Sequence, residues 1–568
     1  MSTEKQQAVL EPKTDALFTK HQEVINKAVK AIHDRTFYAA YPEHPKAYAP
    51  EAAANAEKAF NQQCGKAFEE LLQTGKPTWV GEENSPYWNK PLGITYPKYT
   101  VDTLVSGAQK AFKSWRKVSA DERAGILVES LDRIKNRFFE IAYATQHTTG
   151  QSFGMSFQAS GPHAADRAME AIALGYHELK RFPKSTHWEK PMGKISLHLD
   201  KTFKAIPKGV GLIIGCSTFP TWNTVPGLYA TLITGNSAIV KPHPRAVLPI
   251  AIVVAEIQKV LKEKGLDPNT VQLGMDTSTE LIAKDLAENP AITSIDYTGG
   301  STFGTYIESL GTKKAVFTEK AGVNPVIIDS AQDLREVMRN LAFSVSLYSG
   351  QMCTAPQNLF IPATGIPVAD GGKVSYKEAV ELFKNEVAAL ALHPKKGAGT
   401  LGAIQSPATL ARAEGAKYLG GKVILEAPEV KNPQFEQARI CAPSILEVDA
   451  ADKHIYEKEL FGPVSLVIKT KDTAHSVQLA KSIVQKHGAI TCALYCTNEA
   501  KAASITEEMN DVFAPVSLNL TGYTFINQHA AFSDFHVTGG NPSGNASFTD
   551  PSYINKRFVW VGNRVANN

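Results

Sequence analysis

One stretch of the sequence, residues 317–353, decides the fold. It begins FTEKAGVNPVIID (317–329) and ends YSGQMC (348–353). The β-branched run from Val326 to Ile328, bounded by Pro325 and Asp329, predicts a buried strand. Polar residues after Asp329 offer caps for a helix that we expect over about 334–347. A buried strand followed by a helix is the unit from which parallel α/β sheets are built.

Glu319 and Cys353 lie on opposite sides of this predicted strand and helix. Cys353 follows the helix in a Gly/Gln/Thr/Pro setting that is typical of a loop, where reactive groups usually lie. If the fold brings the two together, the thiol can act as a nucleophile and the carboxylate can activate water afterwards. The alternative is a buried apolar cysteine and a solvated glutamate, because most lone cysteines and glutamates are of those kinds.

Composition excludes several classes of function. The chain has 568 residues, 43% hydrophobic and 20% charged, with a net charge of only +4. This balance argues against nucleic acid or an anionic membrane as the main partner. The six cysteines show no metal-ligand spacing, so we predict no metal site and favour a reducing cytoplasm. The chain starts without a signal peptide, and its most apolar run, 247–257, is too short to span a membrane.

Residues 1–100 are predicted to form an N-terminal helical extension. Apolar residues between Leu17 and Ile32 recur at helical spacing and predict an amphipathic helix over 15–34. Prolines then interrupt the chain before a second helix expected over about 50–73. We expect this extension to pack as a helical layer on the main body. A separate binding module is the alternative.

The next segment, from Asp102 to about Arg181, is predicted to be mostly helical, and strands and helices alternate after it. Ser119 and Glu122 have capping-box spacing and predict a helix start. The run from Val210 to Ile214 predicts a buried strand, and residues 238–241 predict the next strand after an intervening helix. Such a strand-helix-strand unit extends a parallel sheet. The glycines at 209, 211 and 215 do not form Gly-x-Gly-x-x-Gly, so the ordinary dinucleotide fingerprint is absent.

Taken together, these segments resemble the aldehyde dehydrogenase superfamily. Its members have a glutamate before a glycine-containing turn and a proline, then a Gly-Gln-x-Cys loop. Further motifs fall in the family's order: CSTFPTWN (216–223), KPHPRA (241–246), TGGSTFG (298–304) and ELFGPV (459–464). The glutamate, turn and loop residues in this chain are Glu319, Gly322, Pro325, Gly350, Gln351 and Cys353.

The resemblance implies an α/β fold with two main domains. A Rossmann-type parallel-sheet coenzyme domain is expected over 101–325 and an α/β catalytic domain over 326–525. A strand near 193–206 is expected to form an oligomerisation arm. Residues 526–568 are expected to form a C-terminal segment that returns to this arm. A homo-oligomer, either dimer or tetramer, is therefore implied.

The resemblance also implies a reaction. Cys353 would attack an aldehyde to give a thiohemiacetal, a hydride would pass to NADP or NAD, and Glu319 would activate water to release the acid from a thioester. Because members that pass the acyl group to coenzyme A generally lack the glutamate, Glu319 favours a free acid. Thr218 stands where the family has an oxyanion-binding asparagine. Loss of one such donor typically costs about 10²–10³ in turnover.

Coenzyme contacts are carried over residue by residue. Lys241 would hold the adenosine ribose, and the small residues around Gly300 would let the pyrophosphate approach a helix N-terminus. Pro244 occupies a position where NAD-preferring members often have a glutamate. With Arg245 beside it, this predicts that NADP is accepted at least as well as NAD. The remaining expected contacts come from Ile214, Pro242, Arg245, Gly299, Ser301, Glu459, which would bond the nicotinamide ribose, and Phe461, which would pack on the nicotinamide.

Within the superfamily, the runs at 216–223 and 241–246 and the long extension look most like the phenylacetic acid degradation proteins of the PaaN type. This implies aromatic catabolism, with a semialdehyde that carries an acyl-CoA as a candidate substrate. Two other hypotheses stay open: a non-redox hydrolase or ring-opening enzyme on the same fold, and a non-catalytic binding or scaffold protein. His529 and His536 would either face the substrate or be solvated loop residues.

Overall fold

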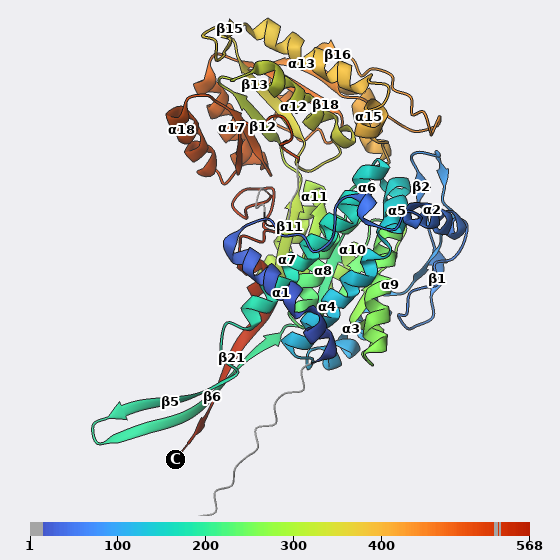
Figure 1. Cartoon of the computed structure of the whole chain (residues 1–568), viewed down its shortest axis with the longest axis vertical. Coiled ribbons are helices and arrows are strands. Elements are labelled where there is room, and N and C mark those ends of the chain that lie inside the picture. The colour runs from blue at the N-terminus through green and yellow to red at the C-terminus, as the bar shows by residue number, and fades with distance from the viewer. Residues whose placement is uncertain (1–14, 528–531, 533–535, 568) are drawn as a thin grey trace, which may run out of the picture.

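The computed structural model describes residues 15–527, 532 and 536–567. Figure 1 shows one α/β body below, a second α/β body above it, and a long β-arm that projects from the lower body. The lower body holds the coenzyme sheet and the upper body holds the catalytic sheet.

The coenzyme sheet has five parallel strands in the order β11-β10-β7-β8-β9. Its central strand β7 (Val210–Ile214) is buried on both faces, which explains its uninterrupted apolar sequence. Ile213 packs in the core with α8 (Pro220–Ile233) and α9 (Leu248–Glu263). Leu212 packs in the core with α3 (Val101–Trp115), α10 (Ala283–Glu288) and α11 (Ser301–Ser309). The other strands are β8 (Ser237–Lys241), β9 (Val271–Leu273), β10 (Ile292–Gly299) and β11 (Ala315–Lys320).

The catalytic sheet has seven strands in the order β16-β17-β18-β13-β12-β19-β20, parallel except for β16. The predicted strand and helix appear as β12 (Asn324–Ile328) and α12 (Leu334–Ser346). The chain changes sheet between β11 and β12, and the predicted domain boundary lies at 325. The other elements are β13 (Pro356–Pro362), β16 (Lys422–Leu425), β17 (Ser444–Asp449), β18 (Val464–Thr470), β19 (Cys492–Tyr495), β20 (Val516–Leu518), α13 (Tyr376–Ala391), α17 (Thr473–His487) and α18 (Glu499–Asn510).

The N-terminal extension is only partly helical. Helix α1 (Ala16–Asp34) packs on α4 (Ala120–Lys135) and α7 (Pro162–Leu179), and the capping box at Ser119 is present. Helix α2 (Ala52–Gln63) is shorter than predicted because the chain turns at Gly65, where φ is +76°. Beyond it, the Gln73 amide exchanges two hydrogen bonds with the backbone of Leu273, which holds this segment extended along β9. Short strands, including β1 (Thr78–Val80) and β4 (Tyr96–Lys98), complete the extension.

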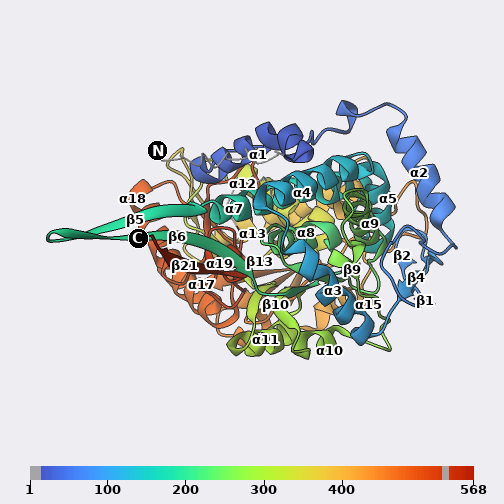
Figure 2. The same cartoon turned by 90° about the horizontal axis from the view of Figure 1, so that it is seen from below.

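The arm is a three-stranded antiparallel sheet in the order β21-β6-β5 (Figure 2). It consists of β5 (Ser185–Met192), β6 (Ile195–Pro207) and the C-terminal β21 (Phe558–Ala566). Several of its apolar side chains are exposed: Met192, Ile195, Leu197, Val559, Val561 and Val565. In the described part of the chain, no helix is both long and apolar enough to cross a membrane.

Candidate active site

Cys353 and Glu319 meet between the two sheets. The Cys353 Sγ lies 3.6 Å from the Glu319 Oε1. Glu319 stands near the carboxyl end of β11 in the coenzyme sheet, not in the same sheet as β12. Cys353 lies in the loop before β13, where its backbone carbonyl accepts a hydrogen bond from the Asn324 amide. The pair therefore forms where the carboxyl edge of one sheet faces the amino edge of the other.

A tight turn precedes Cys353, the predicted nucleophile. Tyr348, Ser349 and Gly350 all have left-handed backbones, with φ of 53°, 51° and 64°. Such backbones persist only where the surroundings fix them. The Tyr348 hydroxyl donates to the Thr149 carbonyl at 2.7 Å, and the Ser349 hydroxyl donates to two backbone carbonyls. Gly350 cannot be replaced without cost, since a Cβ there would lie 2.5 Å from the Gly462 carbonyl oxygen.

Two further side chains complete the cluster. The His536 Nε2 lies 3.6 Å from the Cys353 Sγ and 3.5 Å from the Glu319 Oε1. The Asn223 amide, on the first turn of α8, donates to the same Oε1 at 2.8 Å. Of the two predicted histidines, His536 thus faces the site, and His529 lies outside the described residues. Asn223 lies in the CSTFPTWN motif, but nothing local in the sequence indicates that it contacts Glu319, which is 96 residues away.

Burial dominates the electrostatics of this cluster. It raises the pKa of the Cys353 thiol well above its usual value, and the neighbouring Glu319 charge raises it further. Burial also lowers the pKa of His536 to about 4, so this imidazole is neutral at pH 7. The free protein therefore holds a thiol, a neutral imidazole and a carboxylate in mutual contact.

Thr218 lies next to Cys216. Its hydroxyl lies 3.8 Å from the Cys216 Sγ, and its backbone carbonyl accepts a 2.8 Å hydrogen bond from the Gln151 amide. Cys216 in turn lies 3.5 Å from the Asn223 Oδ1. Cys216 thus lies between Thr218 and Asn223 and connects them within one wall of the site.

A cavity of about 610 Å³ opens onto Cys353. Most of its wall is apolar or aromatic, which suits an uncharged organic group. The Arg167 guanidinium makes a cation–π contact with Trp222, 3.8 Å from the centre of the indole ring. Trp222 also packs against the ring of His536. The lining residues are Phe37, Glu43, Met155, Gln158, Ala159, His163, Phe219, Trp222, Leu347, Met352, Cys353, Thr354, Phe525, Asn527 and His536.

The predicted coenzyme residues gather at one edge of the coenzyme sheet. Ile214, Lys241 and Gly299 end adjacent parallel strands, and ligands of such sheets bind outside their carboxyl ends. A Cβ added to Gly300, directly before α11, would meet no atom within 4 Å. A Cβ on Gly299 would lie only 2.5 Å from the Tyr297 hydroxyl. The open space at a helix N-terminus fits a pyrophosphate.

Lys241 has a partner that the sequence did not reveal. Its ammonium lies 2.6 Å from the Asp276 Oδ1 and donates to the Pro242 carbonyl. Both members of the ion pair are almost fully buried, and burial raises the pKa of Asp276. Arg245 lies beside the catalytic domain, where its backbone carbonyl accepts a hydrogen bond from the Gln405 amide.

Glu459 and Phe461 lie on the catalytic side of the same region. Burial raises the pKa of Glu459 to about 7, although the Arg412 charge opposes this change. The Arg412 guanidinium also donates to the Phe461 carbonyl. Gly462, the next residue, contacts the turn that presents Cys353. This segment therefore adjoins the turn that precedes Cys353.

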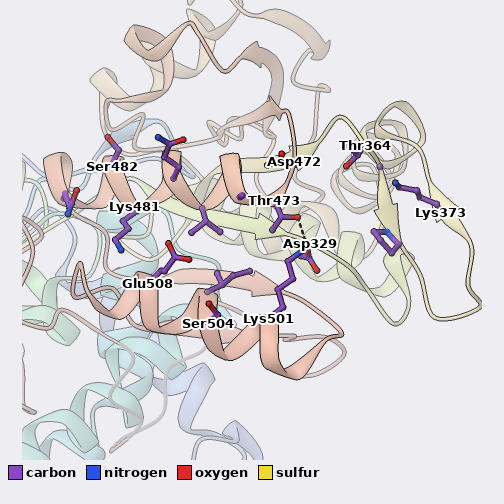
Figure 3. A pocket seen from close by; sticks show the side chains of 17 residues that line it. Asp329, Thr364, Lys373, Asp472, Thr473, Lys481, Ser482, Lys501, Ser504 and Glu508 are labelled. Carbon is purple, nitrogen blue, oxygen red and sulfur yellow. Dashed lines mark hydrogen bonds and ion pairs between the residues drawn. The ribbon is translucent and has the colours of Figure 1, made fainter.

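A second hollow, of about 800 Å³, lies at the opposite edge of the catalytic sheet (Figure 3). Asp329, which follows β12, accepts a 2.6 Å hydrogen bond from the Thr473 hydroxyl and forms an ion pair with Lys501. The charges of Asp329 and Lys501 therefore compensate each other. Cys353 and His536 line the first cavity instead.

Comparison with known proteins agrees with this geometry. The model of the aldehyde dehydrogenase family matches residues 93–554. The chain is 28% identical over 396 residues to 4-trimethylaminobutyraldehyde dehydrogenase B of Danio rerio, which covers 66% of this chain and 69% of that one. It is 26% identical over 421 residues to N-succinylglutamate 5-semialdehyde dehydrogenase of Pseudomonas fluorescens, with coverage of 73% and 78%.

A solved structure matches almost the whole chain. The NAD-dependent aldehyde dehydrogenase from Burkholderia multivorans superposes with a TM-score of 0.94 at 44% identity, covering 98% of this chain and 99% of that one. The predicted fold class is confirmed by these matches, and membership of the family confirms the assignment of NADP or NAD as the coenzyme. This chain belongs to the aldehyde dehydrogenase family and is an NAD(P)-dependent oxidoreductase.

Proposed function

We propose that this protein oxidises an apolar, aromatic aldehyde to the free acid through a thioester on Cys353. The observation that supports this is the contact of Cys353 with Glu319 at an apolar cavity beside the coenzyme edge. When bound, NAD(P) accepts the hydride that leaves the aldehyde carbon. The residues of the chain supply the nucleophile, the base and the binding surface.

The reaction needs two proton transfers, and the cluster has acceptors for both. First the Cys353 thiol gives its proton to His536 or Glu319, each 3.6 Å from its Sγ, and the sulfur bonds to the carbonyl carbon. The acceptor releases this proton to solvent before the thioester is hydrolysed, so Glu319 can take a proton again. After hydride departure leaves a thioester, Glu319 takes a proton from water, whose oxygen displaces the sulfur. Glu319 is held for this step by the Asn223 amide.

Thr218 stays the proposed oxyanion donor, together with backbone amides of its turn. The Asn223 amide is engaged with Glu319, so its position is better explained by orienting the base. A threonine hydroxyl, which is shorter than an asparagine amide and free to rotate, predicts weaker oxyanion stabilisation than an amide donor.

Asp276 changes the expected coenzyme preference. The expectation for NADP came from the absence of a carboxylate at Pro244, beside the ribose-binding lysine. Asp276, in the segment after β9, supplies a carboxylate at that lysine instead, 2.6 Å from its ammonium. A carboxylate accepts hydrogen bonds from ribose hydroxyls and repels a 2′-phosphate. We therefore expect NAD to be preferred, while Arg245 stays the candidate for pairing with a 2′-phosphate.

The substrate proposed from the resemblance is an aldehyde of phenylacetate catabolism. The aromatic wall formed by Phe219, Trp222 and Phe525 supports an aromatic group. Among the described residues that line the cavity, none is lysine or arginine, so a free aldehyde fits this space better than coenzyme A phosphates. A CoA-linked semialdehyde would need its phosphates to lie outside it.

We also propose a homo-oligomer in the cytoplasm. The exposed apolar side chains of the arm would be covered by another subunit. All six cysteines are free thiols, as expected of a reducing compartment.

The test is nicotinamide reduction by the purified protein with NAD or NADP and a panel of aliphatic, aromatic and CoA-linked aldehydes. Reduction that disappears in Cys353→Ala would establish the proposal. Product formation without coenzyme reduction would instead support the hydrolase, which the contact of Cys353 with His536 also favours. Coenzyme binding with no turnover of any kind would leave the scaffold hypothesis.

A further inference from the structure

Part of the cavity wall comes from the N-terminal extension. Phe37 and Glu43 line the cavity that opens onto Cys353, although they lie more than 300 residues away in the sequence. They belong to residues 35–43, which we call the strap. Figure 1 shows the chain after α1 crossing α7 on its way to α2.

The strap is fixed on both sides of Phe37. Before it, the Arg35 guanidinium forms an ion pair with Glu170 of α7 at 3.2 Å. After it, the Ala40 amide donates to the Asp166 carboxylate of α7 at 3.2 Å, and the Tyr41 hydroxyl donates to Asp132 of α4 at 3.0 Å.

The strap also touches Phe532, four residues before His536 in the sequence. The Arg35 guanidinium stacks over the ring of Phe532, and Tyr38 packs on the same ring at 6.4 Å. The backbone amide of Phe532 donates to Glu170, which also pairs with Arg35. Because these contacts fix its neighbours, the position of Phe37 in the cavity wall is defined by the fold.

Phe37 itself is 65% exposed, and so contributes little to the packing of the fold. A large apolar side chain held in water at the wall of a cavity gains burial only when a ligand covers it. Glu43 pairs with His163 at 3.1 Å, and this contact lowers the pKa of Glu43, which is therefore ionised. Among the described residues that line the cavity, Glu43 is the only carboxylate.

We infer that the strap selects the substrate: Phe37 packs against the distal apolar part of the aldehyde, and Glu43 excludes aldehydes with a distal anionic group. The inference rests on the proposed oxidation of aldehydes at Cys353. It assigns the N-terminal extension a role in specificity in addition to its packing on α4 and α7.

Two matched substrate pairs test it: propanal against 3-phenylpropanal, and hexanal against 6-oxohexanoate. Phe37→Ala should raise KM for 3-phenylpropanal about 10-fold and leave KM for propanal within about 2-fold, since apolar contacts discriminate by such factors. Glu43→Gln should lower KM for 6-oxohexanoate about 10-fold and leave KM for hexanal unchanged, because it removes a like charge. Trp79→Ala and Glu51→Gln, exposed residues of the same extension outside the cavity lining, are the controls.

Coenzyme affinity, measured by fluorescence titration, should be the same in all variants and gives a readout independent of turnover. If the wild-type protein oxidises no aldehyde, the proposed function fails. Suppose instead that it oxidises aldehydes but that Phe37→Ala changes KM for 3-phenylpropanal and for propanal by the same factor, or changes neither. The inference that Phe37 selects the substrate is then overturned. If the Glu43→Gln variant still discriminates against 6-oxohexanoate relative to hexanal, the inference that Glu43 excludes anionic aldehydes is overturned.

Discussion

The Asn223 amide donates a 2.8 Å hydrogen bond to the Glu319 Oε1, the same oxygen that contacts the Cys353 Sγ. Replacing Asn223 by Ala should let the carboxylate rotate away from its working position. We expect kcat to fall by about 10–100-fold, because small misplacements of a catalytic group are that costly. Steady-state kinetics measures this, with KM and coenzyme affinity expected to change little. An unchanged kcat would show that Glu319 needs no such support.

Glu319 is expected to raise the pKa of the Cys353 thiol and also to act as the base in turnover. Glu319→Gln separates these two effects. Burial and the Glu319 charge raise the pKa of the thiol, so the coenzyme-free protein should react slowly with iodoacetamide at pH 7 and faster as the pH rises past 9. Glu319→Gln removes the charge and lowers this pKa. Alkylation at pH 8 should then be about 10-fold faster if the pKa of the thiol falls by about one. Aldehyde turnover should nevertheless fall by about 10²–10⁴ because the base is lost.

Peptide-level mass spectrometry measures this alkylation, with Cys353→Ala as the background. Faster alkylation together with lost turnover would support both roles of Glu319. Slower alkylation in Glu319→Gln would contradict the expected change of pKa and make Glu319 the base for the thiol.

His536 should matter as a neutral imidazole. Its pKa of about 4 lies below the usual value of 6.5, so it is not protonated between pH 6 and 8. His536→Asn should then lower kcat/KM by about 10-fold uniformly across that range. A loss confined to the acid side would contradict the assignment.

The lowered pKa of His536 also has a consequence for folding. Because the folded protein binds this proton less readily than the unfolded chain, the stability gained from the neutral imidazole is present above pH 6.5 and lost as the pH falls towards 4. Urea denaturation of the wild type should therefore show a larger loss of stability between pH 6.5 and 5 than that of His536→Asn. Equal losses would argue against a buried neutral His536.

Asp276 should control coenzyme choice. Asp276→Asn removes the carboxylate next to Lys241, and we expect the ratio of NADP affinity to NAD affinity to rise about 10-fold, which corresponds to about 1.4 kcal/mol. Fluorescence titration gives both dissociation constants without turnover. Arg245→Gln is the companion variant: weaker NADP binding there would assign the 2′-phosphate to its guanidinium. If Asp276→Asn leaves the ratio of NADP affinity to NAD affinity unchanged, Pro244 and Arg245, not Asp276, determine the coenzyme preference.

The C-terminal segment is tied to the coenzyme sheet by a buried ion pair. The Arg557 guanidinium donates to both oxygens of Asp296 on β10, at 2.7 and 2.6 Å, and to the Thr231 hydroxyl. Arg557→Met leaves a buried carboxylate without its partner and should cost about 3–5 kcal/mol of unfolding free energy. The exposed pair of Arg339 and Glu336 is the matched control, where Arg339→Met should cost much less unfolding free energy than Arg557→Met. Equal losses in urea denaturation would refute a structural role for Arg557.

Local sequence patterns predicted the main helices and strands and indicated Cys353 as the candidate nucleophile. The apolar run of β7, the capping box at Ser119 and the strand-helix unit of β12 and α12 follow from propensity and burial within a few residues. Periodicity failed for α2, because a left-handed Gly65 and the hydrogen bonds of Gln73 to β9 outweigh local helix preference. Motif order brought Cys353 and Glu319 to attention, although the sequence did not show that they belong to different sheets.

By itself, then, the sequence determined the α/β fold and the identity of the thiol and the carboxylate, since these depend on short-range order along the chain. Only the tertiary structure decided which groups surround them. Asn223, Asp276, His536 and Phe37 come from separate helices and loops that meet when the two sheets face one another. Burial at this meeting point then raises the pKa of Cys353 and lowers that of His536, because desolvation depends on the neighbours that folding supplies and not on residue type.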